Sequence, residues 1–78
     1  MIKIEQGKKY LVTGGSGFLG EELIKRIIGS GGKVVTISRD EGKLIELKQE
    51  YPSIEIFTGD IADRFDVQQA IKGVDGVF

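Results

Sequence analysis

The chain has 78 residues, enough for one small domain, and its 40% hydrophobic and 29% charged residues are typical of a folded globular protein rather than a disordered one. Its 11 basic and 12 acidic residues give a net charge of −1, which offers no bulk attraction to nucleic acid or to an anionic membrane, and no apolar run approaches the length of a membrane helix. The absence of cysteine and histidine excludes disulfides, argues against a zinc or copper site and is consistent with a cytoplasmic protein.

Strand-like and helix-like segments alternate from the start of the chain. Residues 8–13 contain a continuous apolar run, which predicts a buried strand, and glycines follow it at once. Apolar residues then recur at helical spacing and predict a helix over residues 18–29, stopped by the glycines of residues 29–32. The apolar stripe of that helix consists of Leu19, Leu23, Ile24, Ile27 and Ile28.

A second strand and helix follow in the middle of the chain. The β-branched run over residues 34–38 predicts another buried strand. Asp40 is a suitable cap for the next helix, and Pro52 ends it. One face of this helix carries Leu44, Leu47 and Tyr51.

A third strand is predicted over residues 54–57, followed by a shorter helix that Asp63 can cap and Gly73 can close. This helix presents Phe65 or Val67, together with Ile71, as its apolar side chains. Residues 77–78 then begin a fourth apolar segment.

The order of elements is therefore βαβαβαβ, which is typical of an α/β fold with a doubly wound parallel sheet and right-handed crossovers. We expect the strand order 3-2-1-4, with the glycine turn at the carboxyl end of the first strand.

The glycine turn carries the clearest functional signal. Residues 13–20 read T-G-G-S-G-F-L-G and contain G-x-G-x-x-G between a predicted strand and a predicted helix, which is the Rossmann-type context of dinucleotide binding. Glycines there permit the sharp turn and a close approach of pyrophosphate to the helix N-terminus, whereas a simple connection needs only one. The contacts are assigned to Gly14, Gly15, Ser16, Gly17, Phe18, Leu19 and Gly20.

Two other phosphate- or nucleoside-binding classes fit less well. A nucleotide triphosphatase loop would continue with Lys and Ser or Thr, but Glu21 and Glu22 stand there. An adenosyl-methionine site usually has an acid at the end of the first strand, where this chain has Thr13.

The ends of the second and third strands are expected to hold the adenosine half of the cofactor. If the second strand ends at Ser38, the ribose position has a small hydroxyl and Arg39 is available for a 2′-phosphate, which favours NADP. If the strand runs two residues longer, Asp40 takes that position and favours NAD. The alternatives are a solvated Arg39 and an Asp40 that only caps a helix. Asp60, after Gly59, is either a turn residue or an acceptor for the adenine amino group.

With these residues the chain resembles the extended short-chain dehydrogenase/reductase family, and within it the nucleotide-sugar epimerases and dehydratases. Residues 13–20 match its T-G-x-x-G-[FY]-[IL]-G pattern, residues 59–63 its G-D-[ILV]-x-D pattern, and residues 73–78 the segment entering the fourth strand. The resemblance implies that the backbone around Gly14, Phe18 and Leu19 faces the pyrophosphate. It places the ribose-reading position at Ser38, the adenine contact at Asp60, and the Ile61 backbone in the same pocket.

The catalytic residues of that family are not found here. They are a Tyr-x-x-x-Lys pair with a Ser or Thr, whereas Tyr10 lies in a buried strand and Tyr51 has Glu55 four residues later. We therefore expect residues 1–78 to be the N-terminal dinucleotide-binding part of a longer NAD(P)-dependent enzyme, truncated after the fourth strand, with the catalytic and substrate part absent.

The intact enzyme is expected to act on a nucleotide sugar by transient hydride transfer, as an epimerase or dehydratase. The alternative is a non-catalytic NAD(P)-sensing or redox-regulatory module. We also expect a homo-oligomer, or self-association through the truncated sheet edge.

Overall fold

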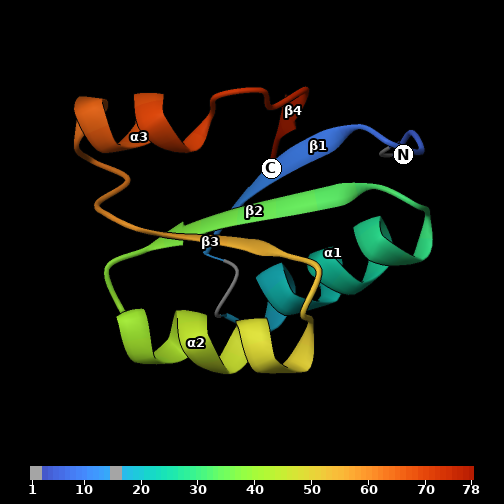
Figure 1. The fold of residues 1–78 in the computed structure, drawn as a ribbon, viewed down its shortest axis with the longest axis horizontal. Helices are drawn as coiled ribbons and strands as arrows, with labels where there is room; N and C mark the ends of the chain where they lie inside the picture. The colour runs from blue at the N-terminus through green and yellow to red at the C-terminus, as the bar shows by residue number, and fades with distance from the viewer. Residues whose placement is uncertain (1–2, 15–16) are drawn as a thin grey trace.

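Four parallel strands form one sheet in the order β3-β2-β1-β4, as the sequence predicts. The computed structural model describes residues 3–14 and 17–78, and Figure 1 shows the sheet between two helical layers. The strands are β1 (Lys9–Thr13), β2 (Lys33–Ser38), β3 (Glu55–Thr58) and β4 (Gly76–Val77), and the helices are α1 (Phe18–Gly29), α2 (Glu41–Glu50) and α3 (Arg64–Ala70). In the part of the chain that the structure describes, no helix is long and apolar enough to cross a membrane.

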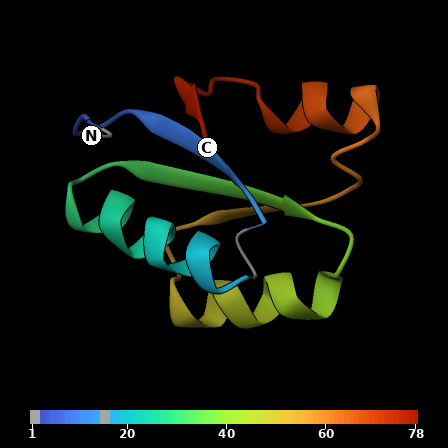
Figure 2. The same cartoon turned by 180° about the vertical axis from the view of Figure 1, so that it is seen from behind.

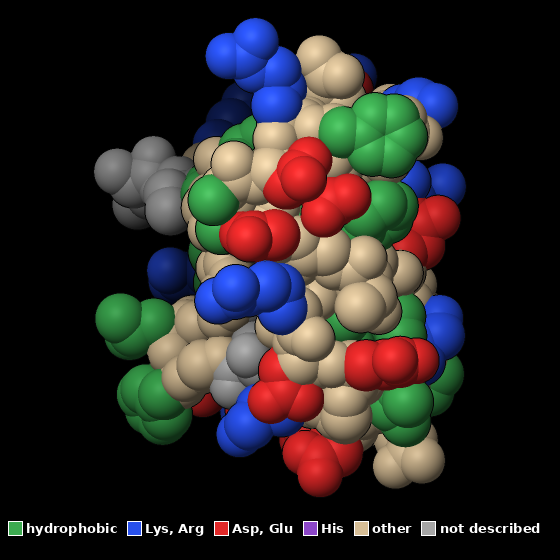
Figure 3. All heavy atoms as spheres, turned by 90° about the vertical axis from the view of Figure 1, so that its left-hand side faces the viewer, with side chains coloured by type: hydrophobic (Ala, Val, Ile, Leu, Met, Phe, Trp, Pro, Cys, Tyr) green, Lys and Arg blue, Asp and Glu red, His purple; other side chains and the backbone are tan. Residues whose placement is uncertain are grey.

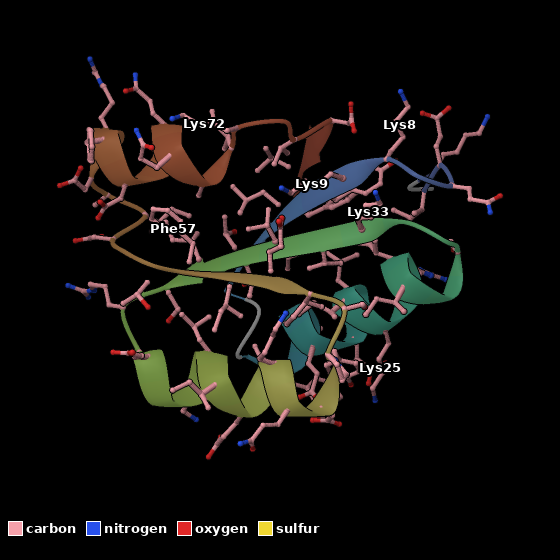
Figure 4. All side chains as sticks on the ribbon, in the orientation of Figure 1. Lys8, Lys9, Lys25, Lys33, Phe57 and Lys72 are labelled. Atoms are coloured by element: carbon pink, nitrogen blue, oxygen red, sulfur yellow. The ribbon has the colours of Figure 1, made fainter. Side chains whose placement is uncertain are left out.

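The two faces of the sheet carry different helices. In Figures 1 and 2, α1 and α2 lie together on one face and α3 covers the other. The first face holds the larger buried cluster, and its members are Tyr10, Val12, Ile24, Ile27, Val34, Leu47 and Ile54. The second face holds Leu11, Val35, Ile37 and Ala70, with Phe57 packed against them between the sheet and α3 (Figure 4). Burial of successive β1 residues on both faces explains the continuous apolar run in the sequence.

The register of the sheet brings the carboxyl ends of three strands to one edge. Thr13 at the end of β1 lies beside Ile37, and Ser38 at the end of β2 lies beside Thr58 at the end of β3. β1 and β2 are also joined by the buried Thr36 hydroxyl, which donates a hydrogen bond to the Val12 carbonyl at 2.7 Å. The loops that leave these three strands therefore start close together.

Some predicted apolar contacts are wrong because the residues lie in the first turn of a helix, away from its packed part. Leu19, assigned to the apolar stripe of α1, is 81% exposed, and the buried positions of that helix are Ile24 and Ile27. In α3, Phe65 is 66% exposed and its alternative Val67 is half-buried, while Ala70 is the buried residue of the helix. Ile71, also predicted as an apolar side chain of this helix, is 39% exposed because it lies at the C-cap, past the last helical residue.

Candidate functional site

A hollow of about 380 Å³ lies at the carboxyl edge of the sheet, where β1, β2 and β3 end. Figure 3 views the molecule from this side. The hollow brings together five of the residues predicted from the sequence, Gly14, Ser38, Arg39, Asp60 and Ile61. Its other lining residues are Thr13, Ile37 and Gly59.

Gly14 and Gly17 have the backbone geometry of a sharp turn at the end of β1. Gly14 has a φ of +68°, a conformation that favours glycine, and its carbonyl accepts a hydrogen bond from the Gly17 amide at 3.0 Å. Gly17 is the N-cap of α1 and provides no side-chain cap. Gly15 and Ser16, also assigned to the site, lie outside the described residues.

The N-terminus of α1 offers backbone donors to a ligand. The first hydrogen bond within the helix runs from the Glu21 amide to the Gly17 carbonyl, at 2.9 Å. The amides of Phe18, Leu19 and Gly20 precede that bond, so the helix itself supplies them with no acceptor. The Phe18 and Leu19 side chains are about 80% exposed. It is therefore the backbone of this turn, rather than its side chains, that can hold an anion.

The end of β2 has the shorter of the two registers considered for the sequence. The strand ends at Ser38, whose hydroxyl accepts a hydrogen bond from the Asp40 amide at 3.0 Å. The Asp40 carboxylate accepts from the Lys43 amide at 3.1 Å and so caps α2, as predicted. Asp40 does not line the hollow, whereas Ser38 and Arg39 do. The part of the hollow next to the end of β2 therefore has a small hydroxyl and a guanidinium.

Arg39 and Asp60 face each other across the rim of the hollow. One guanidinium nitrogen of Arg39 lies 3.7 Å from the Asp60 carboxylate, and the side chains are 79% and 39% exposed. A pair this exposed stabilises the fold by at most about 1 kcal/mol, so both groups can exchange this contact for a ligand at little cost.

Acidic side chains dominate the surroundings of the hollow. Asp40 and Glu41 lie at the start of α2, and Asp63 and Asp66 at the start of α3. In Figure 3 acidic groups lie above and below a basic patch on this edge. Lys8, Lys9 and Lys33 lie at the opposite end of the strands (Figure 4). An anionic ligand at the carboxyl edge therefore depends on local donors, namely the α1 amides and Arg39, rather than on the overall field.

One residue of this region was not identified from the sequence. The Asp66 carboxylate accepts a hydrogen bond from the Asp60 amide at 2.9 Å and so reaches back from α3 to the end of β3. Its spacing in the sequence could have indicated a role near this turn. Asp66 is three residues after the helix cap Asp63, the position at which a capping box has its second polar residue.

The sequence matches a known family and several known proteins. Residues 10–78 match the NAD dependent epimerase/dehydratase family. The chain is 34% identical over 77 residues, 99% of its length, to the decarboxylating sterol-4-alpha-carboxylate 3-dehydrogenase of Homo sapiens. It is 37% identical over 68 residues, 87% of its length, to carbonyl reductase (NADPH) 2 of Sus scrofa.

The fold is also similar to that of a solved structure. The 3-ketoacyl-(acyl-carrier-protein) reductase of Brucella melitensis, complexed with NADH, superposes on 86% of this chain with a TM-score of 0.76 and 31% identity. The chain spans only part of each of these proteins: 19% of the human protein, 28% of the pig protein and 28% of the Brucella protein.

Proposed function

The chain belongs to the NAD-dependent epimerase/dehydratase family, and we propose that its carboxyl-edge hollow binds the adenosine half of a nicotinamide dinucleotide, with NADP favoured over NAD. The observation that carries this proposal is the convergence of the Gly14 turn, the Ser38-Arg39 corner and Asp60 around one hollow. A dinucleotide site needs these three elements together: hydrogen-bond donors for the pyrophosphate, a side chain that contacts the ribose, and residues that contact the adenine.

The described residues fit such a cofactor. The backbone amides at the start of α1 are suited to the pyrophosphate, and the positive φ of Gly14 lets the chain turn sharply from β1 toward that helix. The Asp60 carboxylate and the Ile61 backbone are suited to the adenine side of the hollow. When bound, the nicotinamide ring would supply reversible hydride transfer, and this chain would bind and orient the rest of the molecule.

The preference for NADP is supported by the residues at the end of β2. Ser38 leaves space beside the ribose, and the exposed Arg39 guanidinium can pair with a 2′-phosphate. The relatives include one named for NADPH and one solved with NADH, so they do not distinguish between the two cofactors. The distinction therefore depends on these two side chains.

We extend the proposal to the whole enzyme that would contain this domain. It acts on a nucleotide sugar in the cytoplasm by transient hydride transfer, as an epimerase or dehydratase, and it self-associates through the sheet edge. The family description and the match of residues 13–20 to the pattern of nucleotide-sugar enzymes support the assignment as an epimerase or dehydratase. The acid and base of that reaction would come from outside the 78 residues, because no Tyr-x-x-x-Lys pair occurs in them.

Titration with NADP, followed by amide NMR signals, tests the binding proposal. We expect shifts at Gly14, Ser38 and Asp60, and weaker binding in Gly14→Ala. An alanine at a φ of +68° is strained by about 1–2 kcal/mol, so a turn that relaxes away from this geometry loses roughly five- to thirtyfold in affinity.

Gly73→Ala is the matched control. Gly73 also has a positive φ, +73°, and an added Cβ meets no atom within 4 Å at either glycine, but Gly73 lies at the far end of α3. The two variants should lose similar stability, and Gly73→Ala should bind NADP normally. Equal affinities for the two variants, or shifts confined to another surface, would refute the proposed site.

A further inference from the structure

The turn after β3 is held by a side chain that does not line the hollow. Asp66 lies in the first turn of α3 and is half-buried. Its Oδ2 accepts the hydrogen bond from the Asp60 amide, at 2.9 Å. The Asp66 carboxylate therefore connects the amide of Asp60, whose own carboxylate lies at the rim of the hollow, to the first turn of α3.

The local packing is built around that contact. A Cβ added to Gly59 would lie 3.1 Å from the Cβ, Cγ and Oδ2 atoms of Asp66, closer than most Cβ contacts. Glycine at position 59 thus leaves the room into which the Asp66 side chain fits. Ala62 donates to the Asp60 side chain at 2.8 Å, and Asp63 donates its amide to the Asp60 carbonyl at 2.9 Å.

The side chains of Asp63 and Asp66 have different hydrogen-bond partners and therefore different roles. Asp63 caps α3 by accepting from the amides of Phe65 and Asp66, at 2.8 and 3.1 Å. Asp66 makes the backward contact to Asp60 instead of a contact within its own helix. Asp63 is thus a helix cap, whereas Asp66 orients the turn that carries the rim carboxylate.

From this geometry we infer that Asp66 is a positioning residue, which holds the Asp60 carboxylate where it discriminates for a cofactor whose purine carries a 6-amino group. This inference rests on the proposed function, because it concerns the adenine end of the same hollow. A carboxylate accepts from an amino group and repels a carbonyl oxygen, so its discrimination depends on a fixed orientation.

The test compares NADP with nicotinamide hypoxanthine dinucleotide phosphate, in which a carbonyl oxygen replaces the 6-amino group. Calorimetric titration gives the ratio of the two dissociation constants for wild type, Asp66→Ala, Asp66→Asn and Asp63→Ala. We expect wild type to prefer NADP by about tenfold, the value of one hydrogen bond to a charged group. Asp66→Ala should lose most of this ratio, and Asp66→Asn, which keeps an acceptor oxygen, should retain it.

Asp63→Ala is the matched control, since it removes an acid from the same turn and weakens α3 without removing the acceptor of the Asp60 amide. Its ratio should stay near that of wild type. An unchanged ratio in Asp66→Ala, or an equal loss in Asp63→Ala, would overturn the inference.

Failure of the inference can be separated from failure of the proposed function. If wild type binds NADP but does not distinguish it from the hypoxanthine analogue, dinucleotide binding stands and the adenine role of Asp60 and Asp66 is refuted. If neither compound binds, the proposed function is refuted. In that case the NMR signal of the Asp60 amide, compared between each variant and wild type, still tests whether Asp66 orients the turn. A larger shift in Asp66→Ala than in Asp63→Ala supports this positioning role, and an equal shift overturns it.

Discussion

Replacing Arg39 by alanine should change the cofactor preference without unfolding the chain. In the structure Arg39 is 79% exposed, and its ion pair with Asp60, at 3.7 Å, contributes at most about 1 kcal/mol. A 2′-phosphate would replace that pair with charge-assisted hydrogen bonds worth about 1.5–3 kcal/mol. Solvent at the rim reduces the net gain toward the lower value, so Arg39→Ala should weaken NADP binding by about tenfold and NAD binding by less than twofold.

Calorimetric titration of both cofactors at low and moderate salt checks this expectation. Arg26→Ala is a suitable control, because it removes the same charge from an exposed position in the last turn of α1, far from the hollow. Ser38→Asp should shift the preference toward NAD, since it places a carboxylate beside the 2′-phosphate. Equal losses for NADP and NAD in Arg39→Ala would refute the arginine role, and tighter binding of NAD by wild type would refute the NADP assignment.

Three further changes test the fold. Thr36→Val should lower the free energy of unfolding by about 1 kcal/mol in chemical denaturation, because the buried Val12 carbonyl loses its side-chain donor; an unchanged midpoint would contradict this. Gly32→Ala should destabilise by about 1–3 kcal/mol in the same assay, since its Cβ would lie 2.7 Å from an Ile27 methyl group. Val77→Lys, at a 60% exposed position of the edge strand β4, should reduce self-association in sedimentation equilibrium, and a wild type that is monomeric at high concentration would contradict that expectation.

The alternation of elements could be predicted because periodicity and glycines mark it locally. The helix predicted over residues 18–29 has those bounds in the structure, and the sheet order follows from the crossover rules. The third strand starts at Glu55 rather than at Ile54, because Ile54 belongs to the preceding turn, where its amide bonds the Tyr51 carbonyl. The side chain of Ile54 is nevertheless fully buried. Its hydrophobicity therefore predicted its burial correctly, but not the residue at which the strand begins.

The sequence predicted which residues at the strand ends lie around the hollow, but not the side-chain contacts that join one element to another. Ser38 is the last residue of β2, while Gly14 and Asp60 come just after β1 and β3, and parallel strands bring such positions to one edge. The contact of Asp66 with the Asp60 amide depends on the path of the turn between them, and the hydrophobic pattern of the sequence does not predict that path. The Arg39–Asp60 pair is of the same kind, since it joins the ends of two strands through side-chain reach.

The pairing of β4 with β1 has a consequence for the order in which the molecule assembles. The Lys9 amide donates to the Asp75 carboxylate across 66 residues of sequence, whereas the Thr36 hydroxyl reaches Val12 across 24. Closing the longer loop costs about 0.9 kcal/mol more in chain entropy. The segment that offsets this cost is short: the two residues of β4, with Asp75 and Phe78 on either side hydrogen-bonded to β1. β1 and β2 should therefore dock early around α1, while β4 joins last and opens first, so that native-state hydrogen exchange should be fastest along this seam.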